Sequence, residues 1–496
     1  MAQDEQAERA IQRGMAWLGA ANVFTHIVDL AALVAVLAVL TPRQLGLATA
    51  IRAVQSVLEA AGGTGLGASV AIVQVRGVGD AGARGVLLYG ALIGLVFAGG
   101  FVALQVPMEQ WFGAEDVALL TALAAPRFVL MGASVAPLGM LHRQTDYRTM
   151  AICESGANAV AAIARGGLAL AGFGAAALVL ARTIQAAVLL ILALSMTTFR
   201  VVGPVAMDQL RAVARYGRRV TGALVGDVMQ RYVDYLVVGR MLDLELLGVY
   251  RAAYDVASEP VQPLGDLGVR SGGPVFARLA ERGGDLSRAL AALLRPLLLV
   301  AGLVGAAIFV LADEVMGLFA DGAYVGGITC ARLLIVASLG RIVLQQYQPL
   351  FEWTGEGRAG TRLSLLAVAC LVASLALSIT WGGGTLNSVG VGWILALPVP
   401  LLAGWWMQRR RFQIELRVVV GAMLPALVCT LLALGAGSAA ALLRFSMVAP
   451  FVEFVLRFAM QLVAAVFVFL VAARLLFSVR LGALVSAFRE QKGEGP

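Results

Sequence analysis

Apolar runs long enough to cross a bilayer recur along the whole of this 496-residue chain. A helix that spans the hydrocarbon core needs about 20 mostly apolar residues. Inside a bilayer the backbone polar groups must bond within helices or closed barrels. We therefore predict an all-α integral membrane protein with about fourteen transmembrane helices. Their expected positions are 15–40, 44–73, 83–107, 117–141, 149–171, 174–199, 217–240, 246–273, 288–312, 328–351, 361–381, 387–407, 418–442 and 449–477.

The composition excludes a soluble enzyme and a disordered regulator. Hydrophobic residues make up 60% of the chain and charged residues only 14%, whereas a soluble protein carries roughly 25% charged residues. The net charge of +8 would suggest a nucleic-acid partner in a soluble protein. In a membrane protein the basic residues first set the orientation of the helices, so no nucleic-acid partner is expected.

Arginine alternates with acidic residues from one predicted loop to the next. With a cytoplasmic N-terminus, the cytoplasmic loops hold most of the arginines, including those at 200–219 and 409–417. The outside loops hold Arg43 and Arg444 and otherwise carry acids. This pattern satisfies the positive-inside rule and requires an even number of helices. We expect a multi-pass protein of the bacterial plasma (inner) membrane with both termini in the cytoplasm.

A motif near the start of the chain returns 202 positions later, as Leu40-Thr-Pro-Arg-Gln-Leu-Gly-Leu-Ala48 and Leu242-Asp-Leu-Glu-Leu-Leu-Gly-Val-Tyr250. This indicates parallel repeats related by an axis along the membrane normal. We predict two pseudo-symmetric six-helix lobes and two C-terminal helices. The expected parts are a cytoplasmic N-terminus at 1–14, an N-lobe at 15–199, a cytoplasmic amphipathic linker at 200–216, a C-lobe at 217–407, two further helices at 418–477 and a cytoplasmic tail at 478–496.

Charged residues stand inside several predicted helices, where each costs roughly 2.5–3.5 kcal/mol to insert and usually faces a cavity or a partner. The planar, permanently charged fork of arginine suits phosphate oxygens. We therefore predict a hydrated cavity between the lobes that binds a phosphate or pyrophosphate. The predicted substrate-binding residues are Arg52, Arg127, Arg182, Arg231, Arg251 and Arg270.

A second interpretation of the arginines is structural. Arg251 with Asp255, and Asp266 with Arg270, are four residues apart and would neutralise each other on one helix face. Arg165 is near a predicted helix end, and a long side chain there can extend its charged group to the water at the membrane surface.

The intramembrane acids have two candidate roles: they hold the arginines in place, or they bind a coupling proton or sodium ion. These acids are Asp29, Glu154, Asp227, Asp234 and Asp255. His26 is interpreted as a polar core residue or a proton relay. No cofactor and no metal site are expected, because the four cysteines stand singly and the chain has two histidines. The energy source is left open between a proton, a sodium ion and the membrane potential.

Four short motifs resemble one known family. They are Pro42-Arg-Gln-Leu-Gly-Leu47, Gly65-Leu-Gly-Ala-Ser69 with Gln74, Leu247-Gly-Val-Tyr-Arg-Ala-Ala-Tyr254 and Gly273-Pro-Val-Phe-Ala-Arg-Leu279. They are similar to the polysaccharide transporter (Wzx-like oligosaccharide flippase) family of the multidrug/oligosaccharidyl-lipid/polysaccharide (MOP) exporter superfamily. The resemblance covers essentially the whole chain, and it implies the MATE-like fold of MOP flippases.

The resemblance also implies a function. Such flippases translocate a polyprenyl-diphosphate-linked oligosaccharide from the cytoplasmic to the outer leaflet by alternating access, for the biosynthesis of exopolysaccharide, O-antigen or capsule. The implied partners are an undecaprenyl-diphosphate-linked oligosaccharide, the lipid bilayer, and the polysaccharide polymerase and glycosyltransferases of the same pathway. A transporter rather than an enzyme is expected, and a monomer, because one chain contains both lobes.

Residue roles carry over only in part. Arg52 and Arg270 fall where the related lipid II flippases place cavity arginines. Those flippases have an Arg-Asp pair in the first helix, whereas Asp29 has no arginine beside it in the sequence.

Two other functions are kept as alternatives. A multidrug/cation antiporter of the same superfamily would prefer an acidic, aromatic-lined cavity, and the intramembrane arginines argue against it. A membrane-embedded polysaccharide polymerase would need a large outward-facing loop for its catalytic groups, and every predicted outside loop is short.

Overall fold

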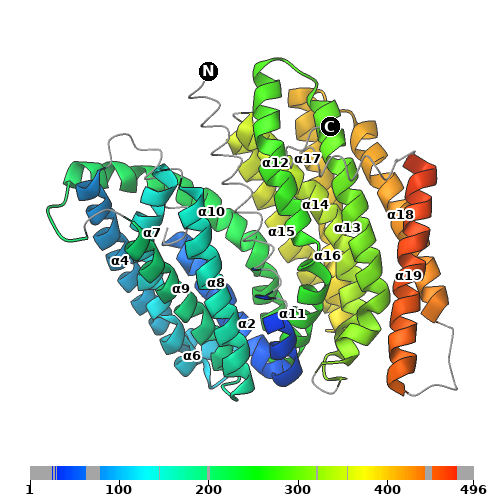
Figure 1. Cartoon of the computed structure of the whole chain (residues 1–496), viewed down its shortest axis with the longest axis horizontal. Coiled ribbons are helices and arrows are strands. Elements are labelled where there is room, and N and C mark those ends of the chain that lie inside the picture. Colours follow the sequence, from blue (N-terminus) through cyan, green and yellow to red (C-terminus); the bar gives the residue numbers. More distant parts are fainter. Residues whose placement is uncertain are drawn as a thin grey trace. The chain divides into compact units, whose positions relative to one another are not determined.

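The computed structural model describes residues 25, 28–29, 31–62, 79–144, 146–197, 201–319, 322–354, 356–441 and 450–477. Within these residues all regular secondary structure is helical, which confirms the predicted all-α class (Figure 1). The chain divides into two compact units, Met1–Gly248 (unit 1) and Val249–Pro496 (unit 2).

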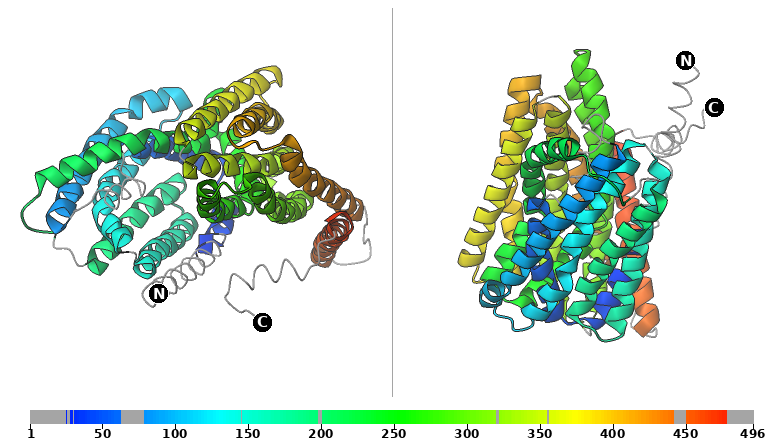
Figure 2. Two further views of the ribbon diagram at one scale, coloured as in Figure 1. Left: turned by 90° about the horizontal axis from the view of Figure 1, so that it is seen from above. Right: turned by 90° about the vertical axis from the view of Figure 1, so that its left-hand side faces the viewer.

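Unit 1 contains the blue to green helices of Figure 2. Its helices α4 and α7 pack with their backbones in contact, because a Cβ atom at either Gly90 or Gly132 would lie 2.1 Å from the carbonyl oxygen of the other. Small residues allow such close approach between membrane helices. The helices of the unit are α2 (Pro42–Ala61), α4 (Asp80–Ala103), α5 (Gln105–Phe112), α6 (Val117–Ala124), α7 (Pro126–Arg143), α8 (Tyr147–Leu170), α9 (Ala175–Met196), α10 (Met207–Met241) and the start of α11 (Leu244–Ser258).

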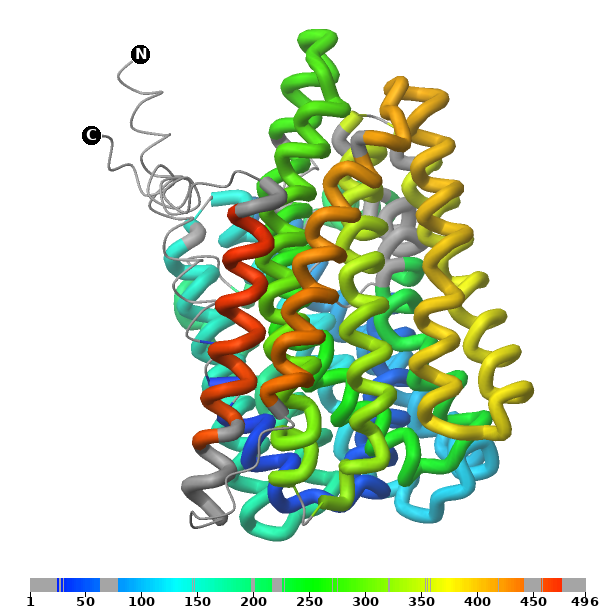
Figure 3. Tube along the Cα trace, turned by 90° about the vertical axis from the view of Figure 1, so that its right-hand side faces the viewer, coloured from blue at the N-terminus to red at the C-terminus, as the bar shows by residue number. Residues whose placement is uncertain are grey.

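Unit 2 is organised around α13, which packs against α14, α18 and α19. Figure 3 shows the orange α18 and the red α19 beside the yellow-green α13. Leu290, Leu294 and Leu298 follow one another at a spacing of four on α13 and are at most 2% exposed. The helices of the unit, after the end of α11, are α12 (Gln262–Glu281), α13 (Leu286–Gly317), the 3-10 helix η2 (Val325–Gly327), α14 (Ile328–Trp353), α15 (Gly357–Trp381), α16 (Leu386–Ala396), α17 (Pro398–Phe412), α18 (Leu416–Ala441) and α19 (Pro450–Phe477).

Eight helical segments of the described chain are long and apolar enough to cross a membrane. Large apolar side chains stand on the outside of the helices, as at Leu95, Val96, Val463 and Phe467, which are 61–66% exposed. Extended apolar faces of this kind suit contact with lipid. The chain is a multi-pass membrane protein, and the total of fourteen spans stays a prediction. The eight segments are Asp80–Ala103, Val117–Arg143, Ala175–Met196, Leu286–Gly317, Val325–Glu352, Arg358–Trp381, Leu386–Phe412 and Val419–Ala440.

The region predicted as an amphipathic linker has two parts. Residues 201–206 are irregular, and α10 then runs for 35 residues from Met207 to Met241 without a break. The sequence contains no proline between these two residues, so nothing removes a backbone donor from the helix. Arg84 holds the irregular part, because its Nε donates to the carbonyl oxygen of Pro204 at 2.9 Å. Part of the predicted linker and the seventh predicted span thus share one helix.

The repeated motif begins a helix in both of its copies. In the first copy the Thr41 hydroxyl accepts a hydrogen bond from the backbone N–H of Gln44, and the Gln44 side chain accepts from the N–H of Thr41. In the second copy the Asp243 carboxylate accepts from the N–H of Leu246 at 2.7 Å. Threonine and aspartate are both good N-caps, and these two positions are 202 residues apart. The motif therefore encodes a helix start twice.

The two copies also contact each other within unit 1. A Cβ atom at Gly46 would lie 1.8 Å from the carbonyl oxygen of Leu244, and one at Gly248 would lie 1.7 Å from the carbonyl oxygen of Pro42. The contact is reciprocal, because Pro42 corresponds to Leu244 in the repeat and Gly46 corresponds to Gly248. Only glycine, which lacks a Cβ, permits this approach of two backbones.

We expect Gly46→Ala and Gly248→Ala each to destabilise the folded protein by about 3 kcal/mol, at the upper end of overpacking costs, because a backbone oxygen cannot move aside as a side chain can. Thermal unfolding of the purified chain in detergent measures the effect. Gly99→Ala in α4 is the matched control, since no atom lies within 4 Å of a Cβ at Gly99. That variant should melt at or slightly above the temperature of the unchanged protein, because alanine favours a helix over glycine. Equal melting temperatures for all three variants would contradict the contact.

Candidate functional site

Three arginines from three helices of unit 1 form a cationic cluster, called the unit-1 arginine cluster: Arg52 on α2, Arg127 on α7 and Arg182 on α9. These helices meet because α9 packs against both α2 and α7. Arg127 is 6% exposed and binds Glu59 of α2, with 2.9 Å between its Nε and the carboxylate. Its Nη1 donates to the carbonyl oxygen of Arg182 and, at 3.2 Å, to Oε1 of Gln185.

Arg52 and Arg182 keep hydrogen-bonding capacity that the described residues do not use. The Nε atoms of both side chains are buried and have no hydrogen-bond partner in the described part of the chain. Arg52 donates from Nη2 to the Tyr232 hydroxyl at 3.2 Å, and its Cζ lies 5.6 Å from the centroid of that ring. Both arginines are half-buried as whole residues, so neighbouring helices cover part of each side chain while these donors stay unused.

The cluster has an excess of positive charge. Arg182 interacts electrostatically with two like charges, Arg52 and Arg127, and with Glu59. Among the described residues, Glu59 is the only carboxylate that forms an ion pair with any of the three arginines. Three guanidinium groups therefore face one carboxylate, in surroundings where burial strengthens every electrostatic interaction. An anion with several oxygen atoms would relieve the repulsion between them.

Uncharged polar groups surround the cluster. Gln185 accepts from Arg127 and donates to Oδ1 of Asn158 on α8. Gln55 is 2% exposed and donates to the carbonyl oxygen of Ala124 at 3.3 Å. Ser56 is buried, and its side chain interacts with Tyr232, which also accepts from Arg52. These contacts hold the cluster in place.

Asp29 has an arginine partner that the sequence did not reveal. Arg165 of α8 donates from Nη2 to the Asp29 carboxylate and to the Asp29 carbonyl oxygen, each at 3.1 Å. Arg165 therefore forms an ion pair, with its side chain 26% exposed, and its predicted reach to the membrane surface stays a prediction. The arginine of the pair comes from another helix, so no spacing along the first helix could predict it.

In unit 2, Arg251 forms an ion pair within its own helix. Its Nη2 and Nε lie 2.6 and 2.8 Å from the two carboxylate oxygens of Asp255, and both side chains are at most 13% exposed. This is the structural alternative predicted from the spacing of four residues. The second such pair stays a prediction; its acid, Asp266, accepts a hydrogen bond from Gln345 at 2.7 Å. The side chain of Arg270 lies outside the described residues.

The other predicted residues are placed as follows. Glu154 on α8 and Arg231 on α10 are half-buried, and Asp234 on α10 is 1% exposed. The side chain of Asp227 and the whole of His26 lie outside the described residues. Among the described residues no group of three histidine, cysteine or acidic side chains could hold a metal ion. The structure thus assembles Arg52, Arg127 and Arg182 in one cluster, and Arg251 with Asp255 in another.

Arg341 on α14 was not among the predicted residues. Its Nη1 donates to the Tyr254 hydroxyl, and its Cζ lies 5.8 and 5.3 Å from the ring centroids of Tyr254 and Trp393. Trp393 in turn donates to the Tyr250 hydroxyl at 2.8 Å. Arg341 stands alone in a long apolar run, without a charge three or four residues away. Its presence within a span was the available signal, since intramembrane arginines seldom lack a role.

We expect Glu59→Gln to destabilise the protein by about 3 kcal/mol, because breaking a buried ion pair leaves an uncompensated charge. Chemical or thermal unfolding in detergent measures the loss. Asp313→Asn is the matched control, since Asp313 pairs with Arg332 at 2.7 Å but is 55% exposed; its exposed pair should contribute less than about 1 kcal/mol. If the two substitutions cost the same, Glu59 is not the buried counter-ion of Arg127.

Comparison with known proteins relates this chain to membrane transporters. The model of a family described as polysaccharide biosynthesis protein matches residues 36–323. No curated protein matches the chain in sequence.

Among the solved structures that resemble most of this fold are three transporters. The lipid II flippase MurJ in an inward closed conformation aligns with a TM-score of 0.73 and 12% identity, over 93% of this chain and 98% of that chain. An inward-facing multidrug resistance MATE family transporter of the MOP superfamily aligns with a TM-score of 0.63 and 15% identity, over 78% of this chain and 94% of the transporter. A point mutant of the Vibrio cholerae MATE transporter VcmN aligns with a TM-score of 0.54 and 12% identity, over 84% of this chain and 99% of the transporter. Likeness at these identities shows a shared fold.

Proposed function

Because this chain belongs to the family of polysaccharide biosynthesis proteins and has the fold of MOP-superfamily transporters, we propose that it flips a polyprenyl-diphosphate-linked oligosaccharide from the cytoplasmic to the outer leaflet. The MurJ structure that it resembles is that of a lipid II flippase. The proposed cargo of this chain is an undecaprenyl-diphosphate-linked oligosaccharide for exopolysaccharide, O-antigen or capsule.

The unit-1 arginine cluster is the observation that carries this proposal. Arg52, Arg127 and Arg182 bring three fixed positive charges together, and Glu59 neutralises one of them. A diphosphate has several negatively charged oxygens that can accept from forked guanidinium groups. The buried Nε atoms without partners on Arg52 and Arg182 are donors that such a ligand would use. Burying charge without a partner is costly, so the cluster favours an anionic ligand.

The remaining parts of the proposal follow from membrane topology. Arginine in the predicted cytoplasmic loops supports cytoplasmic termini and an inner-membrane location. Glycosyltransferases would supply the lipid-linked oligosaccharide on the cytoplasmic side, and a polymerase would consume it outside. Two lobes in one chain support alternating access by a monomer. Coupling to a proton, a sodium ion or the membrane potential would involve acids such as Asp234, which is buried in α10.

Cation export by the MATE mechanism is the second candidate, and the fold likeness to MATE transporters favours it. The charge of unit 1 opposes it. A cation entering beside Arg52, Arg127 and Arg182 would meet repulsion from three guanidinium groups, and Glu59 is the carboxylate of the described chain that pairs with this cluster.

We expect Arg52→Gln and Arg182→Gln each to weaken binding of a polyprenyl-diphosphate-linked oligosaccharide by about 10- to 100-fold, since hydrogen bonds to charged groups contribute roughly 1.5–3 kcal/mol. Binding to the purified chain and flipping in proteoliposomes measure the effect. Arg332→Gln is the matched control, because Arg332 is a paired arginine of unit 2 and should leave both measurements unchanged.

Three outcomes distinguish the functions. Loss of binding and flipping in both cluster variants, with unchanged melting temperatures, supports the flippase. Unchanged flipping in both variants contradicts the role of the cluster in binding diphosphate. Transport of a lipophilic cation that rises when Arg52 or Arg182 is neutralised would favour the antiporter.

A further inference from the structure

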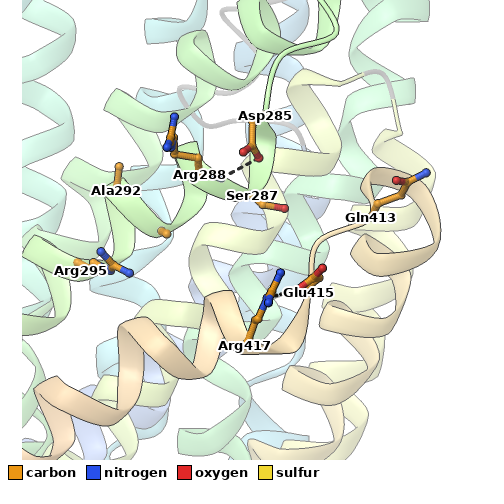
Figure 4. A pocket seen from close by; sticks show the side chains of 9 residues that line it. Asp285, Ser287, Arg288, Ala292, Arg295, Gln413, Glu415 and Arg417 are labelled. Carbon is orange, nitrogen blue, oxygen red and sulfur yellow. Dashed lines mark hydrogen bonds and ion pairs between the residues drawn. The ribbon is translucent and has the colours of Figure 1, made fainter.

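A pocket of about 530 Å³ lies within unit 2, and no residue of the unit-1 arginine cluster lines it. Figure 4 shows that its side chains come from the first turns of α13 on one side, and from the connection between α17 and α18 on the other. We call it the α13–α18 pocket. It is lined by Asp285, Ser287, Arg288, Ala291, Ala292, Arg295, Gln413, Glu415 and Arg417.

The pocket lies where three membrane-spanning segments end. Its residues stand at the beginning of the span Leu286–Gly317, just before the span Val419–Ala440 and just after the span Leu386–Phe412. Two tryptophans in the last turns of α17 form cation–π contacts with arginines. The Cζ of Arg409 lies 5.5 Å from the Trp405 ring centroid, and that of Arg410 lies 3.8 Å from the Trp406 ring centroid. Aromatic and basic residues of this kind mark the membrane–water interface.

Both acids of the pocket have partners on neighbouring residues, whereas two of its arginines form no ion pair within the described residues. Asp285 caps α13, because its carboxylate accepts from the backbone N–H of Arg288 at 3.0 Å. Glu415 forms an ion pair with Arg417. Arg288 and Arg295 share one face of α13 and form no ion pair within the described residues. Three arginines and two acids line the pocket, so it has an excess of one positive charge, and the guanidinium groups of Arg288 and Arg295 have no carboxylate partner among the described residues.

The connection that closes the pocket has a fixed conformation. Gln413 ends α17 with a φ of 57°, in the left-handed region that non-glycine residues seldom adopt. Its backbone N–H donates to the carbonyl oxygen of Arg409 at 3.1 Å. The next residue, Ile414, is fully buried in the core of unit 2. This turn brings Glu415 and Arg417 opposite the first turns of α13.

We propose that the α13–α18 pocket binds the phosphate group of an anionic phospholipid. Guanidinium groups from two helices suit the oxygens of a phosphodiester, and the hydroxyl of Ser287 adds a donor. The interfacial position places these groups at the depth of lipid headgroups. Ala291 and Ala292 lie between Arg288 and Arg295 and give the pocket an apolar wall, and the apolar span of α13 continues beyond Arg295, where acyl chains can follow the helix. This site is independent of the cargo that the protein carries.

The test compares phosphatidylglycerol with phosphatidylcholine by native mass spectrometry of the full chain in detergent. Each arginine near an anionic lipid surface contributes roughly fivefold to binding, so the double variant R288Q/R295Q should bind phosphatidylglycerol roughly 25-fold more weakly. Phosphatidylcholine binding should not change. Both side chains are exposed, so the variant should melt at the same temperature as the unchanged protein.

The matched control is the double variant R358Q/R362Q. It removes the same charge from the first turns of another span, Arg358–Trp381, at residues that are exposed and do not line the pocket. It should bind phosphatidylglycerol as the unchanged protein does. Equal loss in both double variants, or no loss in R288Q/R295Q, would overturn the site. Glycerol 1-phosphate tests the source of the phosphate: competition as strong as that of the lipid would mean a soluble ligand and overturn the lipid proposal.

Discussion

The cost of holding a charge inside a bilayer determines how the polar residues of this chain are arranged. Arg127 is bound by Glu59, Arg165 by Asp29 and Arg251 by Asp255, so each of these arginines meets a carboxylate within 3.1 Å. Arg52 and Arg182 depart from this rule, because they form no ion pair in the described chain and keep buried Nε atoms without acceptors. A protein that had evolved only for stability would fill such positions with apolar side chains, which pack without desolvation cost. A ligand that supplies the missing negative charge is therefore the best explanation of this departure.

The repeated motif shows how a short sequence can specify both local and tertiary structure. Its first polar position caps a helix, and its glycine lets the backbone of one copy touch the other. Threonine in one copy and aspartate in the other perform the same capping role, so the geometry repeats although the residues differ. Beyond the motif the copies diverge. Arg52 of the first copy's helix corresponds to Tyr254 of the second copy's helix. Arg52 donates a hydrogen bond to the hydroxyl of Tyr232. Tyr254 instead accepts a hydrogen bond, from Arg341. The same helix position supplies the cation in one unit and the aromatic hydroxyl in the other.

The helical class, the helix start at each motif copy and the pair of Arg251 with Asp255 could be predicted from the sequence, because each depends on residues a few positions apart. Partners on different helices could not be predicted in this way. Arg165 and Asp29 are 136 residues apart and Arg127 and Glu59 are 68 apart, and helical periodicity carries no information about which faces meet across that distance. Choosing arginines by their place within a span did select Arg52, Arg127 and Arg182, which lie together. Arg341 also lies within a predicted span, but its aromatic partners Tyr254 and Trp393 are on other helices, so the sequence alone does not relate them.

The two units use arginine differently, and the difference bears on where a diphosphate would be held. In unit 2, Arg251 has its own carboxylate, and Arg341 rests on the faces of Tyr254 and Trp393, where cation–π attraction satisfies part of its charge. In unit 1, three arginines depend on Glu59. A transporter must also release its cargo, and a site in which every donor were committed to the ligand would hold it too tightly. Arg127 is held by Glu59 and Gln185 in this structure, so we expect it to keep the cluster assembled while Arg52 and Arg182 exchange the ligand. A division between one fixed and two exchanging arginines would let the same site bind a diphosphate on one side of the membrane and release it on the other.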